Sequence, residues 1–198
     1  MTRFQRGEPD QLTGERLILP LQEFGERKVI YAAGKVSDEQ VKSQLVLQAP
    51  ASFVLTAAAY QEFMRKNRPH EVIEGLLEGV NVKDIDALKE PAAQIRRIIS
   101  AALMPESLCA QIQEAYQRLG CSRVVLWPVT TPYEMLYSAG GLHQRPFLEA
   151  EGFDGVLQAI KTWWASLFGV EAVFYRELYG QKHSDIKTVL AVQQAGEM

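Results

Sequence analysis

The chain has 198 residues, of which 47% are hydrophobic and 23% are charged, and its formal net charge is −3. This composition is typical of a folded globular protein and excludes a disordered chain. The mildly acidic balance excludes the electrostatic footprint of a nucleic-acid binder, and no apolar run approaches the roughly 20 residues of a membrane-spanning helix.

The N-terminal thirty residues are predicted to form a polar lead-in with two short strands, at 17–19 and 28–31. A helix is expected to begin near Asp38, because Ser37 and Gln40 have the spacing of a capping box. The break at Ala49-Pro50 should end this helix, since proline disfavours the helical conformation in the residue before it.

The next part of the chain is predicted to be rich in helices. Residues 52–55 are apolar enough for a buried strand, and Thr56 is a suitable N-cap for the helix that follows. In the second helix we expect Val72 to point inward with its apolar neighbours, and in the third we expect Pro91 to kink or split the helix. The expected helices cover residues 57–66, 70–78, 83–102 and 105–119, the last with Pro105 in its first turn and Gly120 as a left-handed cap.

The stretch from Arg123 to Phe168 organises the rest of the chain. Residues 123–127 form a predicted buried strand that Pro128 must stop, because proline cannot donate to a strand ladder. A loop with a Gly140-Gly141 turn follows, and in α/β proteins such loops are where ligands usually bind. Apolar periodicity then predicts helices at 153–168 and 170–179, and β-branched residues predict a final strand at 187–193.

These elements predict a mixed α+β protein, a helix-rich domain with a small sheet. We find no repeat, low-complexity tract or flexible linker, so we expect a lead-in at 1–30 and a single domain at 31–198. The two cysteines, Cys109 and Cys121, lack the spacing of a zinc site, which predicts free thiols and no metal centre. The first ten residues also lack the apolar stretch of a secretory signal, so we expect a cytoplasmic protein without membrane insertion.

Several segments together resemble a known family. They are Gly34-Lys35, Pro50 to Phe63, Ile95 to Pro105, Ala115 to Gly120, Ser138 to Gly140, and Trp164 to Phe168. In their order and spacing they resemble the amino-terminal nucleotide-binding domain shared by phosphoenolpyruvate synthase, pyruvate phosphate dikinase and rifampin phosphotransferase. The resemblance covers about residues 30 to 194 and implies the fold of the first half of an ATP-grasp domain. Its most specific segments are parts of the scaffold, which indicate fold more than activity.

The chain departs from the family pattern where the family binds phosphate. The resemblance implies an arginine followed by two serines at the end of the central strand, where this sequence has Trp127, Pro128 and Val129. An indole cannot replace the bidentate cation that arginine offers to a phosphate. The resemblance also implies that the second half of the ATP-grasp site, with its metal-binding carboxylates, would follow the last residue of this sequence.

Two sets of residues are candidates for binding. The candidate ligand-binding residues are Lys35, Thr130, Thr131, Glu134, Gly140 and Gly141. For each a plainer interpretation remains: a solvated lysine, a helix cap for the Thr-Pro-Tyr-Glu run, and a simple turn for the glycine pair. The candidate partner surface is aromatic: Trp127, Tyr133 and Trp163. Adjacent residues of a helix point in different directions, so we expect one of the two indoles at 163 and 164 to be more exposed.

Two hypotheses follow. The first is a non-catalytic interaction, assembly or regulatory module that derives from this ATP-binding domain and binds another protein or a second copy of itself. It has no catalytic residue, metal or cofactor. The second is an ATP-binding half-site with Mg²⁺, the subunit of a split phosphotransferase that acts on pyruvate or a related substrate with a partner chain. Phosphoryl transfer depends on metal and cations that neutralise charge, so the missing arginine favours the first hypothesis.

Overall fold

The computed structural model of this chain describes residues 16–20, 51–81, 84–128, 148–186 and 188–195. Its centre is a five-stranded sheet in the order β1-β2-β5-β3-β4, and each neighbouring pair of strands is antiparallel. The strands are β1 (Ile18–Pro20), β2 (Ser52–Leu55), β3 (Arg123–Pro128), β4 (Leu148–Glu151) and β5 (Leu190–Gln194). The predicted α+β class is confirmed. The ligand-binding rule that we applied to the loop after β3 holds for parallel strands and does not apply to this antiparallel sheet. The loop itself lies outside the described residues.

The central strand β5 shows why the sheet has two different faces. Leu190 and Val192 belong to the large core, whereas Ala191 between them belongs to a small apolar cluster on the opposite face. Alternate residues of a strand point to opposite faces, and all three side chains are buried. The β-branched and apolar composition of this strand predicted an interior position, and β5 does lie between β2 and β3.

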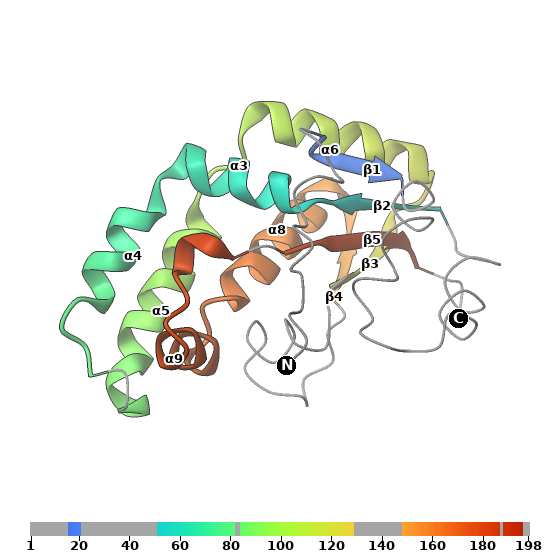
Figure 1. Cartoon of the computed structure of the whole chain (residues 1–198). Coiled ribbons are helices and arrows are strands. Elements are labelled where there is room, and N and C mark those ends of the chain that lie inside the picture. The colour runs from blue at the N-terminus through green and yellow to red at the C-terminus, as the bar shows by residue number, and fades with distance from the viewer. Residues whose placement is uncertain (1–15, 21–50, 82–83, 129–147, 187, 196–198) are drawn as a thin grey trace, which may run out of the picture.

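Six helices and a short 3-10 turn accompany the sheet in the part of the chain that the structure describes (Figure 1). The helices are α3 (Ala57–Asn67), α4 (Pro69–Leu77), α5 (Ile85–Ala101), α6 (Glu106–Leu119), α8 (Gly152–Ser166) and α9 (Val170–Leu178), and η2 (His183–Asp185) is the 3-10 turn. The predicted helices at 57–66, 70–78, 153–168 and 170–179 are confirmed within one or two residues at each end. None of the helices in the described ranges is long and apolar enough to cross a membrane.

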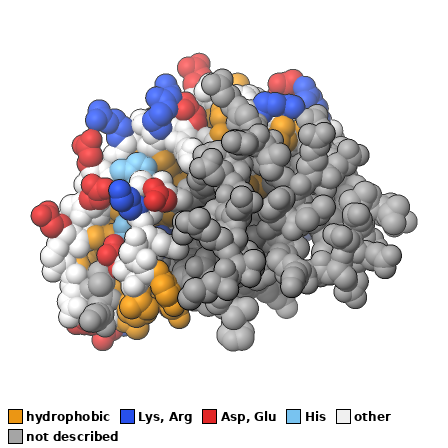
Figure 2. Space-filling model, viewed as in Figure 1, with side chains coloured by type: hydrophobic (Ala, Val, Ile, Leu, Met, Phe, Trp, Pro, Cys, Tyr) orange, Lys and Arg blue, Asp and Glu red, His pale blue; other side chains and the backbone are white. Residues whose placement is uncertain are grey.

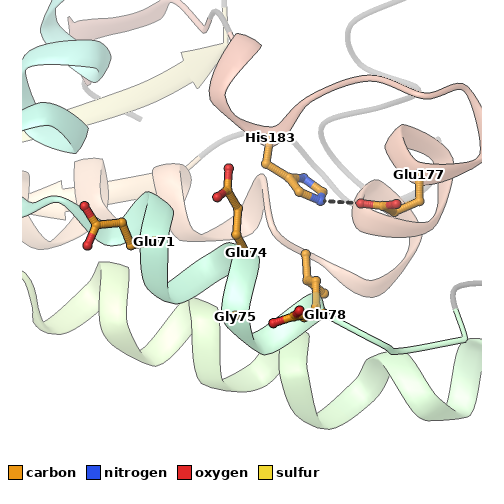
Figure 3. Close-up of a pocket in the computed structure, with 7 residues that line it drawn as sticks. Glu71, Glu74, Gly75, Glu78, Glu177 and His183 are labelled. Carbon is orange, nitrogen blue, oxygen red and sulfur yellow. Dashed lines mark hydrogen bonds and ion pairs between the residues drawn. The ribbon is translucent and has the colours of Figure 1, made fainter.

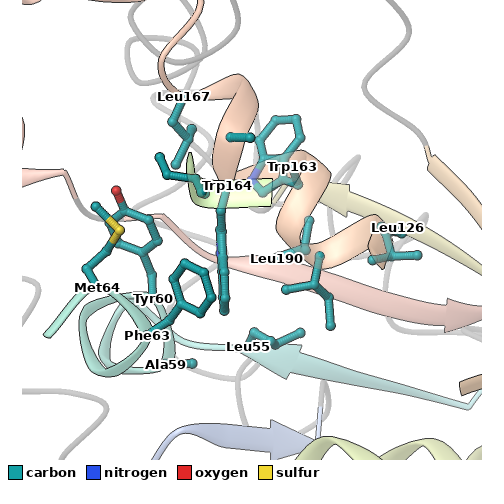
Figure 4. Close-up of a cluster of buried hydrophobic side chains, with 14 of the residues drawn as sticks. Leu55, Ala59, Tyr60, Phe63, Met64, Leu126, Trp163, Trp164, Leu167 and Leu190 are labelled. Carbon is teal, nitrogen blue, oxygen red and sulfur yellow. The ribbon is translucent and has the colours of Figure 1, made fainter. Parts of the chain in front are cut away.

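The core between α3, α8 and the sheet is built around Trp164. Its side chain is 1% exposed, and its ring lies 4.7 Å from the ring of Phe63 and 5.8 Å from that of Tyr60, measured between centroids. Figure 4 shows these aromatic side chains from α3 and α8 grouped beside Leu55 and Leu190 of the sheet. Aromatic pairs at such separations stabilise a core beyond the area that they bury.

Two expectations about the third and fourth helices need correction. Pro91 lies inside α5 and does not split it, because the buried residues Leu88, Ala92, Ile95 and Ile99 hold the helix against the core on both sides of the proline. Pro105 is the N-cap of α6 and not its first helical residue. The left-handed cap at Gly120 is confirmed, with φ of 65°.

Thr56 and Val72 also behave differently from our expectation. Thr56 is the N-cap of α3, but its hydroxyl donates to the carbonyl oxygens of Arg16 and Leu17 and makes no cap hydrogen bond, so it connects α3 to the start of β1. Val72 is 47% exposed, because Ile73 and Leu77 take the inward face of α4. The predicted strand at 28–31 and the helix from Asp38 lie outside the described residues.

Candidate functional site

The end of β3 carries Trp127, where the resemblance described above implies an arginine. Trp127 is half-buried, and its indole Nε1 donates to the side-chain oxygen Oε1 of Gln193 on β5, at 3.1 Å. The ring packs against the small apolar cluster of Leu19, Val54 and Ala191, on the sheet face opposite the large core. Its single N–H donor is therefore used within the sheet, and the indole supplies no charge to this face.

Most of the candidate binding residues stay predictions. Lys35, Thr130, Thr131, Glu134, Gly140, Gly141 and the aromatic candidate Tyr133 lie outside the described residues. The structure brings none of them into a described site. Of the nine candidates, it describes Trp127 and Trp163.

Trp163 is part of the core. Its side chain is 7% exposed, and its indole Nε1 donates to the hydroxyl of Thr188, which is itself buried. Trp164, one position later, is also buried. Trp163 is the more exposed of the two indoles, as expected, but both are buried, because α8 is covered on more than one side: Trp164 contacts α3, and Trp163 contacts the segment that leads into β5. Trp163 is not an exposed anchor for a partner.

A groove with a cavity volume of about 580 Å³ lies between α4 and the end of α9. It is lined by Glu71, Glu74, Gly75, Leu77, Glu78, Glu177 and His183. Figure 3 shows these carboxylates on α4 and α9 around the histidine, and Figure 2 shows acidic side chains beside a histidine on the α4 side of the molecule. Four glutamates in one groove disfavour a phosphate ligand, because like charges repel.

Beneath this groove, Arg176 makes a set of buried hydrogen bonds. Its Nε donates to Nδ1 of His183 at 2.9 Å, and its Nη2 donates to the carbonyl oxygen of Leu167 at 2.6 Å. Its guanidinium carbon lies 5.2 Å from the centre of the Phe168 ring. Arg176 is 4% exposed, so α9 places a cation inside the protein between the end of α8 and the η2 turn.

The hydrogen bonds assign the protonation of His183. Because Nδ1 accepts from Arg176, the ring proton must be on Nε2, which donates to Oε1 of Glu177 at 2.9 Å. Burial, and then the positive charge of Arg176, hold the pKa of His183 below its ordinary value. Burial lowers the pKa of Arg176 to about 10, so the guanidinium keeps its charge at neutral pH. The set therefore consists of a cation, a neutral imidazole and a carboxylate.

Nearby, Tyr60 has a buried hydroxyl without a hydrogen-bond partner among the described residues. Burial raises the pKa of Tyr60 above its usual value, so the phenol stays neutral. The phenol lies in the core with Trp164, and Tyr60 is not among the residues that line the groove. It offers no reacting group to a ligand in the groove.

Among the described residues, no group of three or more His, Cys, Asp and Glu is arranged to hold a metal ion, and both cysteines are free thiols. Sequence reasoning missed Arg176 and His183. Arg176 lies in the predicted helix at 170–179 and His183 lies in the polar stretch after it, and nothing in the sequence indicates that η2 folds back onto α9.

Comparison with known proteins places this fold. The family described as pyruvate phosphate dikinase, AMP/ATP-binding domain, matches residues 33–197. The chain is 31% identical over 180 residues to a probable phosphoenolpyruvate synthase of Methanothermobacter thermautotrophicus. The aligned residues make up 87% of this chain and 26% of that protein.

Two further relatives agree with this match. A probable phosphoenolpyruvate synthase of Methanocaldococcus jannaschii is 31% identical over 186 residues, 90% of this chain and 16% of that protein. The phosphoenolpyruvate synthase of Escherichia coli is 31% identical over 157 residues, 77% of this chain and 20% of that protein. The chain spans about a quarter or less of the length of these relatives. With the family match over most of its length, this chain belongs to the pyruvate phosphate dikinase AMP/ATP-binding domain family.

Proposed function

We propose that this chain is a non-catalytic protein-interaction, assembly or regulatory module built on the family's ATP-binding domain. The scaffold supports a stable module, because the sheet and its helices enclose an apolar core centred on Trp164. Such a scaffold can be kept while the chemistry of the site is lost, because function depends on the residues of a site and not on the fold alone.

The observation that carries the proposal is Trp127 at the end of β3. The resemblance implies an arginine there, with five N–H donors and a fixed charge, whereas the indole has one donor, and that donor is bonded to Gln193. A triphosphate needs neutralised charge and fixed donors for both binding and transfer. This substitution removes a cation from the place where the resemblance expects a phosphate contact.

A second candidate function is favoured by the family match itself, which is to an AMP/ATP-binding domain. In this alternative the chain is an ATP-binding half-site or subunit of a split phosphotransferase that acts on pyruvate or a related substrate. Lys35, Thr130, Thr131, Glu134, Gly140 and Gly141 would then hold ATP with Mg²⁺. Micromolar affinity for MgATP is expected under this alternative and not under the first proposal.

The proposed partner surface can be tested at Tyr133, the aromatic candidate six positions after Trp127 in the sequence. We expect Tyr133→Ala to reduce the amount of partner that co-purifies with the tagged chain from its native host by about tenfold or more, because buried aromatic anchors dominate binding energy. Recovered partners are identified by mass spectrometry, and light scattering after size exclusion measures self-association.

Leu103→Ala is the matched control for Tyr133→Ala. Leu103 is 81% exposed, in the segment between α5 and α6, and is not a candidate for the partner surface. We expect this variant to recover the partner as the unmodified chain does. A monomeric chain that recovers no stoichiometric partner contradicts the proposal, and full recovery with Tyr133→Ala shows that the surface is elsewhere.

A further inference from the structure

A short chain of hydrogen bonds fastens the turn η2 to helix α9. We call Arg176, Glu177 and His183 the latch. His183 bridges the other two residues, with its Nδ1 bonded to Arg176 and its Nε2 bonded to Glu177, both at 2.9 Å. The imidazole is 9% exposed, and its ring centre lies 6.1 Å from that of Phe168.

The latch tolerates one protonation state of His183. In the neutral ring Nδ1 is an acceptor, which the guanidinium N–H requires. A second ring proton would sit on Nδ1 and face that N–H, so two donors and two positive charges would meet inside the protein. This arrangement loses a buried hydrogen bond and gains a repulsion, and neither is compensated by the bond to Glu177.

We propose that the latch is an acid-released device: protonation of His183 detaches the turn η2 from α9 while the sheet and the core helices stay folded. This inference does not depend on the proposed function. The detached segment would be the one that joins α9 to β5. In the latched state this segment is held by further local bonds, from the Gln181 amide to the Arg176 carbonyl and from the Asp185 amide to the Lys182 carbonyl.

Charged groups from each neighbouring element act on His183. On α9 these are Arg176, which opposes protonation, and Glu177, which favours it; on α4, Glu74 also favours it. Glu71 and Glu78 line the same groove and are exposed, as Glu74 is. Lys182 and Asp185, beside the histidine in sequence, are exposed too. The pKa of His183 in the latched state is nevertheless lowered, since burial and Arg176 outweigh the carboxylates.

The sign of the pH dependence follows from this shift. A released His183 regains the ordinary pKa of about 6.5, so the released state binds more protons than the latched state below that pH. The equilibrium constant for opening should therefore be constant above about pH 6.5. Below this value it should rise by at most about tenfold for each pH unit, and it should level off once the latched histidine also titrates.

Two measurements on the full chain test the device. Histidine side-chain ¹⁵N NMR at pH 7.5 should show Nε2 protonated and Nδ1 unprotonated in His183. Native-state hydrogen exchange between pH 7.5 and 5, corrected for the intrinsic rate, should show the amides of Gln181 and Asp185 losing protection below about pH 6.5, by at most about tenfold per pH unit. The amide of Val192 in β5 should keep its protection.

Three variants separate the device from a general acid effect. His183→Asn keeps an acceptor toward Arg176 and cannot titrate, so the pH dependence at Gln181 and Asp185 should disappear. Glu177→Gln keeps an acceptor for Nε2 without the charge that favours protonation, so opening should continue to rise to lower pH than in the unmodified chain. His70 is a half-buried histidine on α4 and provides the control. His70→Gln should change neither the pH dependence at Gln181 and Asp185 nor the pH at which opening levels off.

Several outcomes would overturn the proposal. One is a ring that is charged or carries its proton on Nδ1 at pH 7.5. Another is the same pH dependence in His183→Asn, which would place the titrating group elsewhere. A third is loss of protection at Val192 by the same factor and at the same pH as at Asp185, which would mean that acid unfolds the whole domain.

Discussion

Replacing Trp164 with alanine is expected to lower the free energy of unfolding by about 3–5 kcal/mol. The indole is 1% exposed and contacts the rings of Phe63 and Tyr60, so its removal loses apolar burial and leaves a cavity between α3, α8 and the sheet. The cavity cannot close easily, because residues of α3 and α8 belong to one buried cluster with Leu55 and Leu190 of the sheet. Equilibrium denaturation in urea, followed by circular dichroism, measures the change.

Leu103→Ala is the control for this prediction. It also removes a large apolar side chain, but one that is 81% exposed, and we expect a change within about 0.5 kcal/mol. If Trp164→Ala cost less than about 1 kcal/mol, the indole would not be the centre of a close-packed core.

Replacing Arg176 with methionine is expected to lower the free energy of unfolding by about 2–5 kcal/mol. The substitution keeps an apolar stem of similar length, but it leaves the Leu167 carbonyl and Nδ1 of His183 without the donor that each now has. Each buried acceptor that loses its partner costs about 1–3 kcal/mol. The measurement is again urea denaturation, at pH 7.5, where His183 is neutral.

Arg176→Lys separates charge from geometry. Lysine keeps the positive charge but has no rigid fork with which to reach Leu167 and His183 together, so we expect a loss smaller than that of methionine but still measurable. If Arg176→Met were as stable as the unmodified chain, the buried hydrogen bonds would be dispensable, and the latch that they form would not hold η2 on α9.

Local sequence signals predicted much of the scaffold. The strand at 52–55 and the strand stopped by Pro128 are both present, because a short apolar run bounded by a turn or proline has few alternatives. Gly120 ends α6 as predicted, since a left-handed cap needs a residue without a side-chain penalty. Pro91 does not split α5, because burial outweighs local propensity: the apolar face of α5 continues on both sides of it.

Other features could not be predicted because they depend on tertiary contacts. Strand β4, with the sequence Leu-Glu-Ala-Glu, alternates between half-buried and exposed residues at the sheet edge, and its polar composition does not indicate a strand. Val72 looks as apolar as Ile73, and only packing decides which one points inward. The contact between Arg176 and His183 joins residues seven positions apart across a turn, and no sequence periodicity produces it.

The candidate site was predicted unevenly. The family resemblance directed attention to Trp127, and the structure places it at the end of β3 with its donor used by Gln193. The same aromatic argument failed for Trp163, because exposure cannot be inferred from helical spacing when a helix is covered on several sides. Lys35 and Glu134 remain predictions, since they lie outside the described residues.

The central claim is that this chain keeps the scaffold of an ATP-binding domain without its affinity for ATP. Isothermal titration calorimetry of the chain with ATP and Mg²⁺ tests it directly, with Lys35→Ala in parallel to locate any binding. We predict no saturable heat up to about 1 mM ATP. The dissociation constant would then be weaker than about 1 mM, which corresponds to less than about 4 kcal/mol of binding energy. Saturable one-to-one binding with a micromolar dissociation constant, lost in Lys35→Ala, would contradict the claim and establish the ATP-binding half-site instead.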